Sequence, residues 1–295
     1  MASAKRVADI LRRLEKAGLD PRPEPFTAVR DIDWEALPPT VDSRTLLQGA
    51  RLQQKRDQVA NLLALIGDLT LTPALSQRER GAPPEARAAA TGLVAADFGA
   101  GSGHLGLPLA CLHPDVTVWL IDVNEYALNL ARSRAEAAGL TNVRFFAGPV
   151  TDFAEAFHLG FALHACGPAS DEAQERCLAH GATYVICPCD LGQLQHSPHP
   201  YPRSTRFRGL LTRDEYDALA SAADWTNSED PSRREQGARS MAYVNLDRNL
   251  AAEEVGYETL LLLGYPLQST PKNQVLYGWR PGPRPADLPL KDKVL

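Results

Sequence analysis

The sequence predicts an α/β protein built on a Rossmann-like, doubly wound sheet of seven strands, mostly parallel with an antiparallel last strand. Three observations lead to this prediction. From residue 92 onward, short apolar runs alternate with helical patterns, which is typical of a parallel sheet with helices on both faces. A glycine-rich turn joins the first of these runs to a helical pattern. A turn-rich segment at 266–273 separates the last two runs, which favours a hairpin and therefore an antiparallel final strand.

The N-terminal part of the chain predicts a helical extension before the sheet. Apolar residues from Val7 to Leu14 follow the i, i+3, i+4, i+7 spacing of an amphipathic helix at 6–18. A proline-rich stretch then predicts an extended linker, and a second helix follows at 45–67. Residues 68–90 combine several helix breakers with little apolar periodicity, so we expect a mobile insertion there.

The remaining elements follow in order along the chain. The predicted strands are residues 93–98, 116–121, 143–147, 160–164, 182–187, 257–263 and 274–279. The predicted helices between them include residues 104–112, 124–138, 170–180 and 246–254. The proline-rich tail at 281–295 predicts disorder.

Composition and charge exclude several classes of protein. The 295 residues are 44% apolar and 23% charged, which is typical of a globular protein and excludes wholesale disorder. A net charge of −5 gives no support for coating nucleic acid through bulk positive charge, although a local basic groove stays open. No secretory signal follows Met1, the apolar run at 260–263 is too short to span a bilayer, and five cysteines do not suggest a disulfide framework. We therefore expect a cytoplasmic protein with reduced thiols and no membrane contact, and we leave its oligomeric state open.

The glycine-rich turn is the most informative motif for a ligand. Asp97 ends an apolar run, and Gly99, Gly101 and Gly103 follow it at alternate positions. Glycines let a backbone approach a ligand closely, and the N–H groups at a helix start favour an anionic or polar group. With Gly106 the turn also fits the G-x-G-x-x-G pattern of dinucleotide binding, so NAD(P) stays an alternative. The carboxylate of Asp97 would repel a pyrophosphate but attract the ammonium group of S-adenosylmethionine (SAM), which we therefore predict as the cofactor.

Residues after the next two strands support a nucleoside ligand. Asp122 ends the second predicted strand, where a carboxylate accepts hydrogen bonds from both ribose hydroxyls, and Val123 follows it in the same predicted site. Val150 and Asp152 come after the third strand. We expect Val150 against the adenine ring and Asp152 near its exocyclic amine.

The ends of the fourth and fifth strands predict the reaction site, because ligands of a doubly wound sheet bind beyond the carboxyl ends of its strands. His164 is a candidate general base, since an imidazole titrates near neutrality. Cys166 is a candidate catalytic residue in the same run. Asp171 either takes part in catalysis or, with Ser170, caps the helix that follows. Lys272, in the turn before the last strand, either contacts the substrate or is a solvated turn residue.

The cysteines near these strand ends leave three interpretations open. Together with His164, residues Cys166, Cys187 and Cys189 are of types that bind zinc, but C-x-C spacing is unlike the C-x-x-C of structural zinc sites, and we predict no metal. A nucleophilic cysteine is the second interpretation. In the third, the thiols pack as small apolar groups that shape the pocket.

Two groups of basic residues leave contact with RNA open. The first consists of Arg203, Arg206 and Arg208 beside Tyr201 and Phe207, and the second of Arg233, Arg234 and Arg239. Basic residues beside aromatic ones suit phosphate contact combined with base stacking. The segment 200–240 nevertheless holds equal numbers of acidic and basic residues, so it is neutral as a whole.

Several motifs occur in the order found in a known family. They are D-F-G-A-G-S-G-H at 97–104, L-H-A-C-G at 163–167, C-P-C at 187–189, N-L-D-R at 245–248 with A-A-E-E at 251–254, and P-K-N at 271–273. Over residues 33–280 the sequence resembles the methyltransferase domain of glutathione S-transferase C-terminal domain-containing proteins. That domain belongs to the class I SAM-dependent methyltransferases, a group that includes tRNA methyltransferases. The sequence departs from the family pattern at Asp190, where a further cysteine is expected after C-P-C.

The resemblance implies roles for the residues that match its motifs. Asp97 and the three glycines at 99, 101 and 103 would hold the methionine end of SAM, and Asp122 would hold the ribose. His164 and the cysteines at 166, 187 and 189 would line the catalytic pocket.

The resemblance also predicts the organisation and function of the chain. We expect an N-terminal helix and linker at 1–44, a SAM-dependent methyltransferase domain at 45–280 and a disordered tail at 281–295. The expected function is transfer of a methyl group from SAM to RNA, either tRNA or rRNA. The alternatives are an NAD(P)-dependent oxidoreductase and a SAM- or RNA-binding module without turnover.

Overall fold

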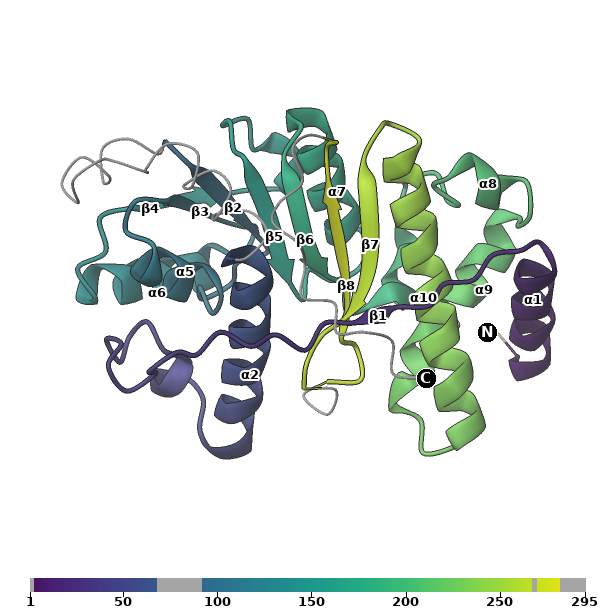
Figure 1. Cartoon of the computed structure of the whole chain (residues 1–295), viewed down its shortest axis with the longest axis horizontal. Helices are drawn as coiled ribbons and strands as arrows, with labels where there is room; N and C mark the ends of the chain where they lie inside the picture. Colours follow the sequence, from purple (N-terminus) through teal and green to yellow (C-terminus); the bar gives the residue numbers. More distant parts are fainter. Residues whose placement is uncertain (1–2, 68–91, 267–269, 282–295) are drawn as a thin grey trace.

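Figure 1 shows the computed structural model, which describes residues 3–67, 92–266 and 270–281 and is built around an eight-stranded sheet. The strands are β1 (Glu24–Pro25), β2 (Val94–Phe98), β3 (Thr117–Asp122), β4 (Val143–Ala147), β5 (Leu159–Leu163), β6 (Thr183–Cys187), β7 (Glu258–Leu263) and β8 (Gln274–Trp279). Their order across the sheet is β1-β7-β8-β6-β5-β2-β3-β4. β8 is antiparallel to β6 and β7, whereas the other described pairings are parallel. The predicted sheet, mostly parallel with an antiparallel last strand, is therefore confirmed.

The sheet has one strand more than the seven predicted. β1 consists of two residues of the proline-rich linker, which pair in parallel with Leu262 and Leu263 of β7. Both residues of β1 are exposed. An exposed strand of two residues has no apolar alternation, so no pattern in the sequence marks it.

Helices cover both faces of the sheet, as a doubly wound fold requires. α2 (Gly49–Ile66), α5 (Gly106–Leu112) and α6 (Glu125–Ala137) share an apolar core with one face. α7 (Ala169–His180) and α10 (Pro231–Glu253) share a second core with the other face. α6 begins at Asn124, whose side chain accepts a hydrogen bond from the N–H of Ala127, and this cap satisfies a donor that the helix cannot. The predicted doubly wound α/β architecture is confirmed.

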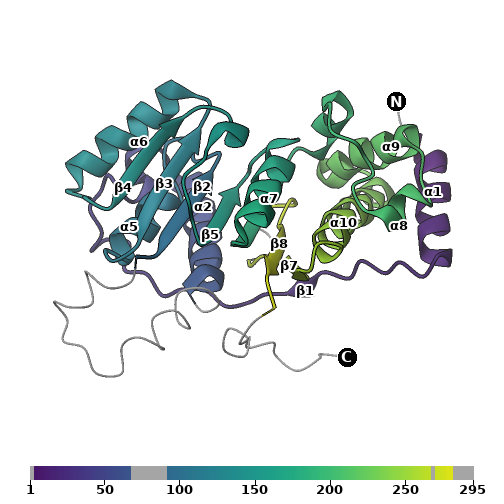
Figure 2. The same ribbon diagram turned by 90° about the horizontal axis from the view of Figure 1, so that it is seen from above.

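A third core lies at one end of the sheet, where Figure 2 shows α1, α8, α9 and α10 gathered. α1 (Ala4–Lys16) buries the apolar residues from Val7 to Leu14, so the predicted amphipathic helix is confirmed. It packs against α9 (Arg213–Ala223) and α10, and the short α8 (Thr205–Arg208) lies beside them.

Two helices in this region differ from the prediction. α9 has no counterpart among the predicted helices, although Thr212 and Glu215 form a capping box at its start. The helix predicted at 246–254 is only the last part of α10, which already begins at Pro231 and runs through Gly237 without a break. A Cβ atom at Gly237 would lie 2.6 Å from the backbone nitrogen of Thr226, so this glycine permits close packing and does not end the helix.

The segment between α1 and α2 crosses the molecule in Figure 1 and returns to the glycine-rich turn. The N–H of Phe26 donates to the carbonyl of Leu263, and the N–H of Arg30 donates to the carbonyl of Ala60. Further on, Ser43 hydrogen bonds to His104. Residues before the predicted boundary at 44 thus contact the predicted domain, and the boundary itself stays a prediction.

Two predictions fall largely outside the described ranges. They are the insertion at 68–90 and the tail at 281–295, of which the structure describes only residue 281. Within the described ranges, no helix has the length and apolar character needed to cross a membrane.

Candidate active site

The glycine-rich turn forms an open loop between β2 and α5. Gly99, Gly101 and Gly103 all have positive φ angles, of 70°, 54° and 81°, which residues with a side chain rarely adopt. A Cβ at Gly103 would lie 2.7 Å from a side-chain atom of Leu107, whereas a Cβ at Gly101 would meet nothing within 4 Å. Gly103 is therefore needed for packing under the loop, and Gly101 faces open space in which a ligand can approach the backbone.

Asp97 lies behind this loop. The side chain is only 2% exposed, and its Oδ2 accepts a hydrogen bond from the N–H of Gly106 at 3.0 Å. Burial raises the pKa of Asp97 to about 8, and the nearby carboxylate of Asp122 raises it further against the lowering effect of that hydrogen bond. Asp97 thus holds the loop in shape. Because it is buried, it could contact the ammonium group of a ligand only through a water molecule or after a small movement of the loop.

Asp122 and Val123 lie at the end of β3 beside the loop. The two carboxylate oxygens of Asp122 accept hydrogen bonds from Gly101 N–H at 2.7 Å and from Asn124 N–H at 2.8 Å. A carboxylate has about four acceptor positions, so two remain for ribose hydroxyls. The side chain of Val123 is 72% exposed, which makes it an apolar surface for a purine ring.

The residues predicted to hold adenine from the third strand differ in exposure. Val150 and Asp152 are the ends of η3 (Val150–Asp152), a short 3-10 helix. Val150 is buried in the core with Phe98 and Phe153. Asp152 is exposed, and its Oδ1 accepts a hydrogen bond from Thr151. Asp152 is therefore accessible to a ligand, whereas little of Val150 can touch one.

His164 occupies an unusual position after β5. It is the one non-glycine residue with a positive φ in the part of the chain that the structure describes, at 66°. Such strain persists where surrounding structure enforces it, and it is concentrated at functional sites. Nε2 lies 3.3 Å from Oε1 of Gln58 on α2, so a hydrogen bond there needs a proton on Nε2 and leaves Nδ1 as the acceptor. Burial, with Lys55 and Lys272 nearby, lowers the pKa of His164 to about 4, so the imidazole is neutral at physiological pH.

The cysteines surround the backbone of His164. The thiols of Cys166 and Cys189 lie 3.5 and 3.6 Å from the carbonyl oxygen of His164. Cys187 is buried, and its thiol donates to the carbonyl of Lys272 at 3.7 Å. Among the described residues, no group of three or more His, Cys, Asp or Glu side chains is placed to hold a metal ion.

Lys55 and Gln58 of α2 complete this region, and the sequence analysis did not select them. Burial lowers the pKa of Lys55 against the effect of the thiols of Cys187 and Cys189, and Lys55 in turn lowers the pKa values of His104 and His164. Lys55 therefore lies between the glycine-rich loop and the ends of β5 and β6. Within the described ranges it has no ion pair or hydrogen bond, which leaves its charge for an anionic group of a ligand. The sequence offered one indication of such a role for Lys55: it is a charged residue just before the apolar second half of a helix, which is buried in the structure.

Lys272 matches neither of the two interpretations made from the sequence completely. Its Nζ forms an ion pair with Oδ1 of Asp224 at 2.6 Å, and the side chain is 17% exposed. Asp224 begins η5 (Asp224–Asn227) and also accepts a hydrogen bond from Gly192 N–H. Lys272 is thus held at the site rather than free in solvent, and whether it contacts a substrate stays a prediction.

Asp171 is placed in a buried ion-pair network, and this environment does not fit the predicted catalytic role. Both carboxylate oxygens bind the guanidinium of Arg248, at 2.9 and 2.7 Å, and they also accept hydrogen bonds from Arg203 and Tyr201. Despite burial, the two arginines hold the pKa of Asp171 well below its usual range. The alternative of a helix cap is wrong, because α7 starts after Pro168 with no side-chain cap.

Much of the predicted basic surface is also structural. Arg203 pairs with Asp171 and Glu175, and Tyr201 and Phe207 are buried. Arg239 pairs with Glu15 of α1. Arg233 differs, because its guanidinium stacks on the ring of Trp225 at 5.4 Å and remains exposed. Arg203 thus helps to hold the fold together, whereas Arg233 is exposed on Trp225, the residue that follows Asp224, the partner of Lys272.

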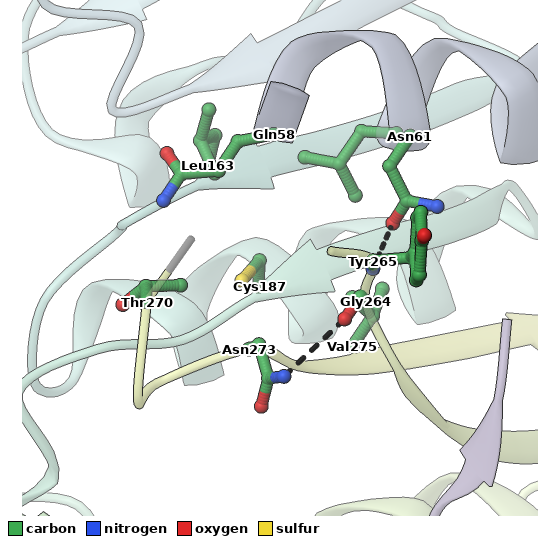
Figure 3. Close-up of a pocket in the computed structure, with 10 residues that line it drawn as sticks. Gln58, Asn61, Leu163, Cys187, Gly264, Tyr265, Thr270, Asn273 and Val275 are labelled. Carbon is green, nitrogen blue, oxygen red and sulfur yellow. Dashed lines mark hydrogen bonds between the residues drawn. The ribbon is translucent and has the colours of Figure 1, made fainter. Parts of the chain in front are cut away.

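A small pocket, with a cavity volume of about 20 Å³, opens where β5, β6 and β8 meet α2, as Figure 3 shows. α2 contributes Gln58 and Asn61, and the connection between β7 and β8 contributes Tyr265, Thr270 and Asn273. Asn61 Oδ1 accepts a hydrogen bond from Tyr265 N–H at 3.0 Å, and Asn273 Nδ2 donates to Gly264 O at 3.2 Å. The pocket is therefore lined by neutral amides and apolar groups, and it shares Gln58 with His164.

Comparison with known proteins agrees with this geometry. Residues 90–197 match a family described as a methyltransferase domain. The glutathione S-transferase C-terminal domain-containing protein homolog of Drosophila melanogaster is 35% identical over 253 residues, which are 84% of this chain and 40% of that protein. The human protein of the same name, without "homolog", is 33% identical over 250 residues, 84% of this chain and 36% of that protein. A solved structure of a SAM-dependent methyltransferase from Aquifex aeolicus is similar with a TM-score of 0.37 and 13% identity, over 78% of this chain and 98% of that chain, a likeness too low to carry an argument.

Strand order, the glycine-rich loop and the match over residues 90–197 together indicate a SAM-dependent methyltransferase domain. The chain is similar to the glutathione S-transferase C-terminal domain-containing proteins, as predicted. It spans 40% or less of the length of those two relatives. SAM is the cofactor of such a domain, so the NAD(P) alternative is not supported. The open space at Gly101 and the two remaining acceptor positions on Asp122 fit this cofactor.

Proposed function

We propose that this chain is an enzyme that transfers the methyl group of SAM to RNA, either tRNA or rRNA. The methyltransferase domain supports the reaction type, and the small pocket at the ends of β5 and β6 supports the acceptor class. The proposed location of the protein is the cytoplasm, as expected from the sequence.

The lining of the pocket is the observation that carries the RNA proposal. The cavity volume is only about 20 Å³, far below the range of roughly 300–1,000 Å³ that is common for small-molecule sites. A whole small-molecule substrate therefore does not fit, and the pocket can receive only the edge of a group that belongs to a larger acceptor. The amides of Gln58 and Asn273 suit the polar edge of a base, and the half-exposed ring of Tyr265 at the pocket suits stacking.

Cations beside the pocket support an acceptor with phosphates. Lys272 lies on the connection that lines the pocket, and its partner Asp224 precedes Trp225, on which Arg233 stacks. An exposed arginine on an aromatic ring combines charge with a stacking surface, and single-stranded nucleic acids bind such surfaces. Lys272 and Arg233 thus place two cations on neighbouring segments, although Asp224 pairs with the first and the chain as a whole is acidic.

The proposed roles of the site residues follow from their positions. SAM supplies an activated methyl group, so the protein mainly has to position and desolvate the two reactants. The glycine-rich loop and Lys55 would hold the methionine end of SAM, Asp122 the ribose, and Val123 with Asp152 the adenine. Where the methylated atom of the substrate carries a proton, Nδ1 of the neutral His164 imidazole would take up that proton.

The test is methyl transfer from SAM labelled in its methyl group. The purified chain is incubated with total RNA, with fractionated tRNA and rRNA that lack modifications, and with a protein extract. Label in RNA that nuclease digestion releases as a modified nucleoside would support the proposal. Asp122→Ala serves as the negative control, because it should remove SAM binding. Label in protein but not in RNA would overturn the acceptor class, and SAM binding without any transfer would favour the binding module.

A further inference from the structure

The loops after β5 and β6 are held together on both sides of a pair of cysteines. The N–H of His164 donates to Cys187 O at 2.9 Å, and the N–H of Gly167 donates to Asp190 O at 3.0 Å. Cys166 and Cys189 lie between these two hydrogen bonds. Parallel strands run about 4.7–4.9 Å apart, and disulfide-bonded cysteines have Cα atoms about 4.4–6.8 Å apart. The two backbone hydrogen bonds thus hold Cys166 and Cys189 on adjoining loops that continue β5 and β6.

The two sulfur atoms also point to the same place. Both thiols reach the carbonyl oxygen of His164, at 3.5 Å from Cys166 and 3.6 Å from Cys189. Each thiol also shifts the pKa of the other, as neighbouring thiols do. The two side chains therefore converge on the same point of the backbone.

The surroundings make the two thiols unequal. The thiol of Cys189, the backbone N–H of Asp190 and the charge of Lys272 stabilise the thiolate of Cys166 and lower its pKa, while burial opposes them. The side chain of Cys166 is exposed, whereas Cys189 is half-buried, and its pKa is raised. Thiolates and not thiols are the reactive form, so Cys166 is the sulfur that an oxidant meets first.

The other three cysteines lack these features. Cys177 and Cys187 are buried, and burial raises the pKa of each thiol. Cys111 lies on α5, and burial raises its pKa too.

We propose that Cys166 and Cys189 form a peroxide-sensitive site that closes to an intramolecular disulfide across the ends of β5 and β6. The thiolate of Cys166 attacks one oxygen of hydrogen peroxide, the O–O bond breaks, and hydroxide leaves and takes up a proton to become water. The product is a sulfenic acid on Cys166. The sulfur of Cys189 then attacks the sulfur of Cys166, the S–O bond breaks, and a second water leaves. Two thiols lose two protons and two electrons, hydrogen peroxide takes them up and is reduced to two waters, and a dithiol reductant reverses the change.

This inference does not depend on the proposed reaction, since it concerns a modification that is read without any methyl transfer. The bond would join two loops that surround His164. Its formation would therefore fix the backbone next to the pocket.

The test uses the full, reduced chain treated with a small molar excess of hydrogen peroxide, quenched with an alkylating agent and digested with trypsin. Trypsin cleaves after Arg144, Arg176 and Arg203, which places Cys166 alone in peptide 145–176 and Cys189 in peptide 177–203. We expect a cross-linked pair of these two peptides, with the bond assigned to Cys166 and Cys189 by fragmentation. Dithiothreitol should release both peptides.

Variants make the assignment specific. Cys189→Ser should abolish the cross-link and leave a sulfenic acid on Cys166 that a 1,3-dicarbonyl reagent traps, whereas Cys166→Ser should abolish both products. Cys111→Ser and Cys187→Ser should still form the cross-link. The proposal would be overturned if the folded wild-type chain, checked by circular dichroism, gave no cross-link, or if the bond joined Cys187 to Cys189 instead.

Discussion

Replacing Asp171 with asparagine tests whether this carboxylate holds the fold together or takes part in catalysis. The carboxylate is fully buried and binds Arg248, whose side chain is only 1% exposed, through two hydrogen bonds. Asparagine keeps the shape but removes the charge and turns an NH₂ group towards the guanidinium. The variant therefore leaves Arg248 as a buried cation without a compensating charge from position 171.

The expected loss of stability is large. Removing one partner of a buried ion pair costs about 3–5 kcal/mol, because the remaining charge is left uncompensated. At about 2.1 cal/mol/K per residue, 295 residues give an unfolding entropy of about 0.6 kcal/mol/K, so each kcal/mol lowers Tm by about 1.6 °C. We therefore expect Tm to fall by about 5–8 °C. Because the pKa of Asp171 is depressed, its contribution is complete above the unfolded pKa of about 3.9 and is lost as pH falls through the folded pKa, so the difference in Tm should be the same from pH 5 to 8.

Thermal unfolding followed by circular dichroism measures this change, and titration calorimetry with SAM at a temperature well below Tm measures the site. Asp214→Asn is the matched control, because Asp214 pairs with Arg6 at the surface, and such pairs contribute about 0–1 kcal/mol. The double variant Asp171→Leu with Arg248→Met should recover much of the lost Tm, since apolar residues of similar volume can replace a buried pair. An unchanged Tm for Asp171→Asn together with a loss of methyl transfer would refute the structural role and restore the catalytic one.

Three further predictions concern the candidate site. Gly103→Ala should weaken SAM binding at least tenfold. A methyl group at this φ of 81° would be strained and would clash with Leu107 of α5, so the loop would have to change shape. An unchanged Kd in titration calorimetry would contradict this prediction. Lys55→Gln should raise the Kd for SAM about tenfold through loss of a charged hydrogen bond, whereas Arg51→Gln, in the exposed first turn of α2, should leave it unchanged. His104 and His164 have folded pKa values of about 4, below an unfolded value of about 6.5, so the stability that they contribute is present above pH 6.5 and is lost as pH falls towards 4. A double His→Gln variant should therefore lose less Tm than the wild-type chain between pH 7 and 5, and equal losses would count against neutral histidines.

The elements that carry the cofactor site could be predicted because their signals are local. Asp97 and Asp122 each end an apolar run, and the parallel sheet brings the ends of β2 and β3 to one edge. The glycines at 99, 101 and 103 follow from the same pattern, since only a few folds place such a turn between a strand and a helix. Residues within one strand or one turn thus decide this part of the site.

The other part of the site depends on contacts between distant segments. Asp171 was considered as a base or a cap, yet its partner Arg248 is 77 positions away, and no local pattern reveals such a pair. Lys55 was visible only as one charged residue in the middle of a helix, because the packing of α2 on the sheet decides which of its residues faces the cleft. The arginines at 203 and 233 have the same charge in the sequence, but one is buried in a network and the other is exposed on Trp225.

The two-residue strand β1 protects the molecule against self-association. A sheet edge presents unpaired N–H and C=O groups to which strands of other molecules can add, and apolar edges are the most prone to this. β7 would be such an edge, since it ends in four consecutive leucines at 260–263, and β1 covers its last two residues. Pro25 has no N–H and therefore offers an incoming strand one donor fewer. A chain shortened to begin after Pro25 would expose this edge of β7, together with the faces of α9 and α10 that α1 covers, although the cofactor loop and the pocket would be untouched by the deletion.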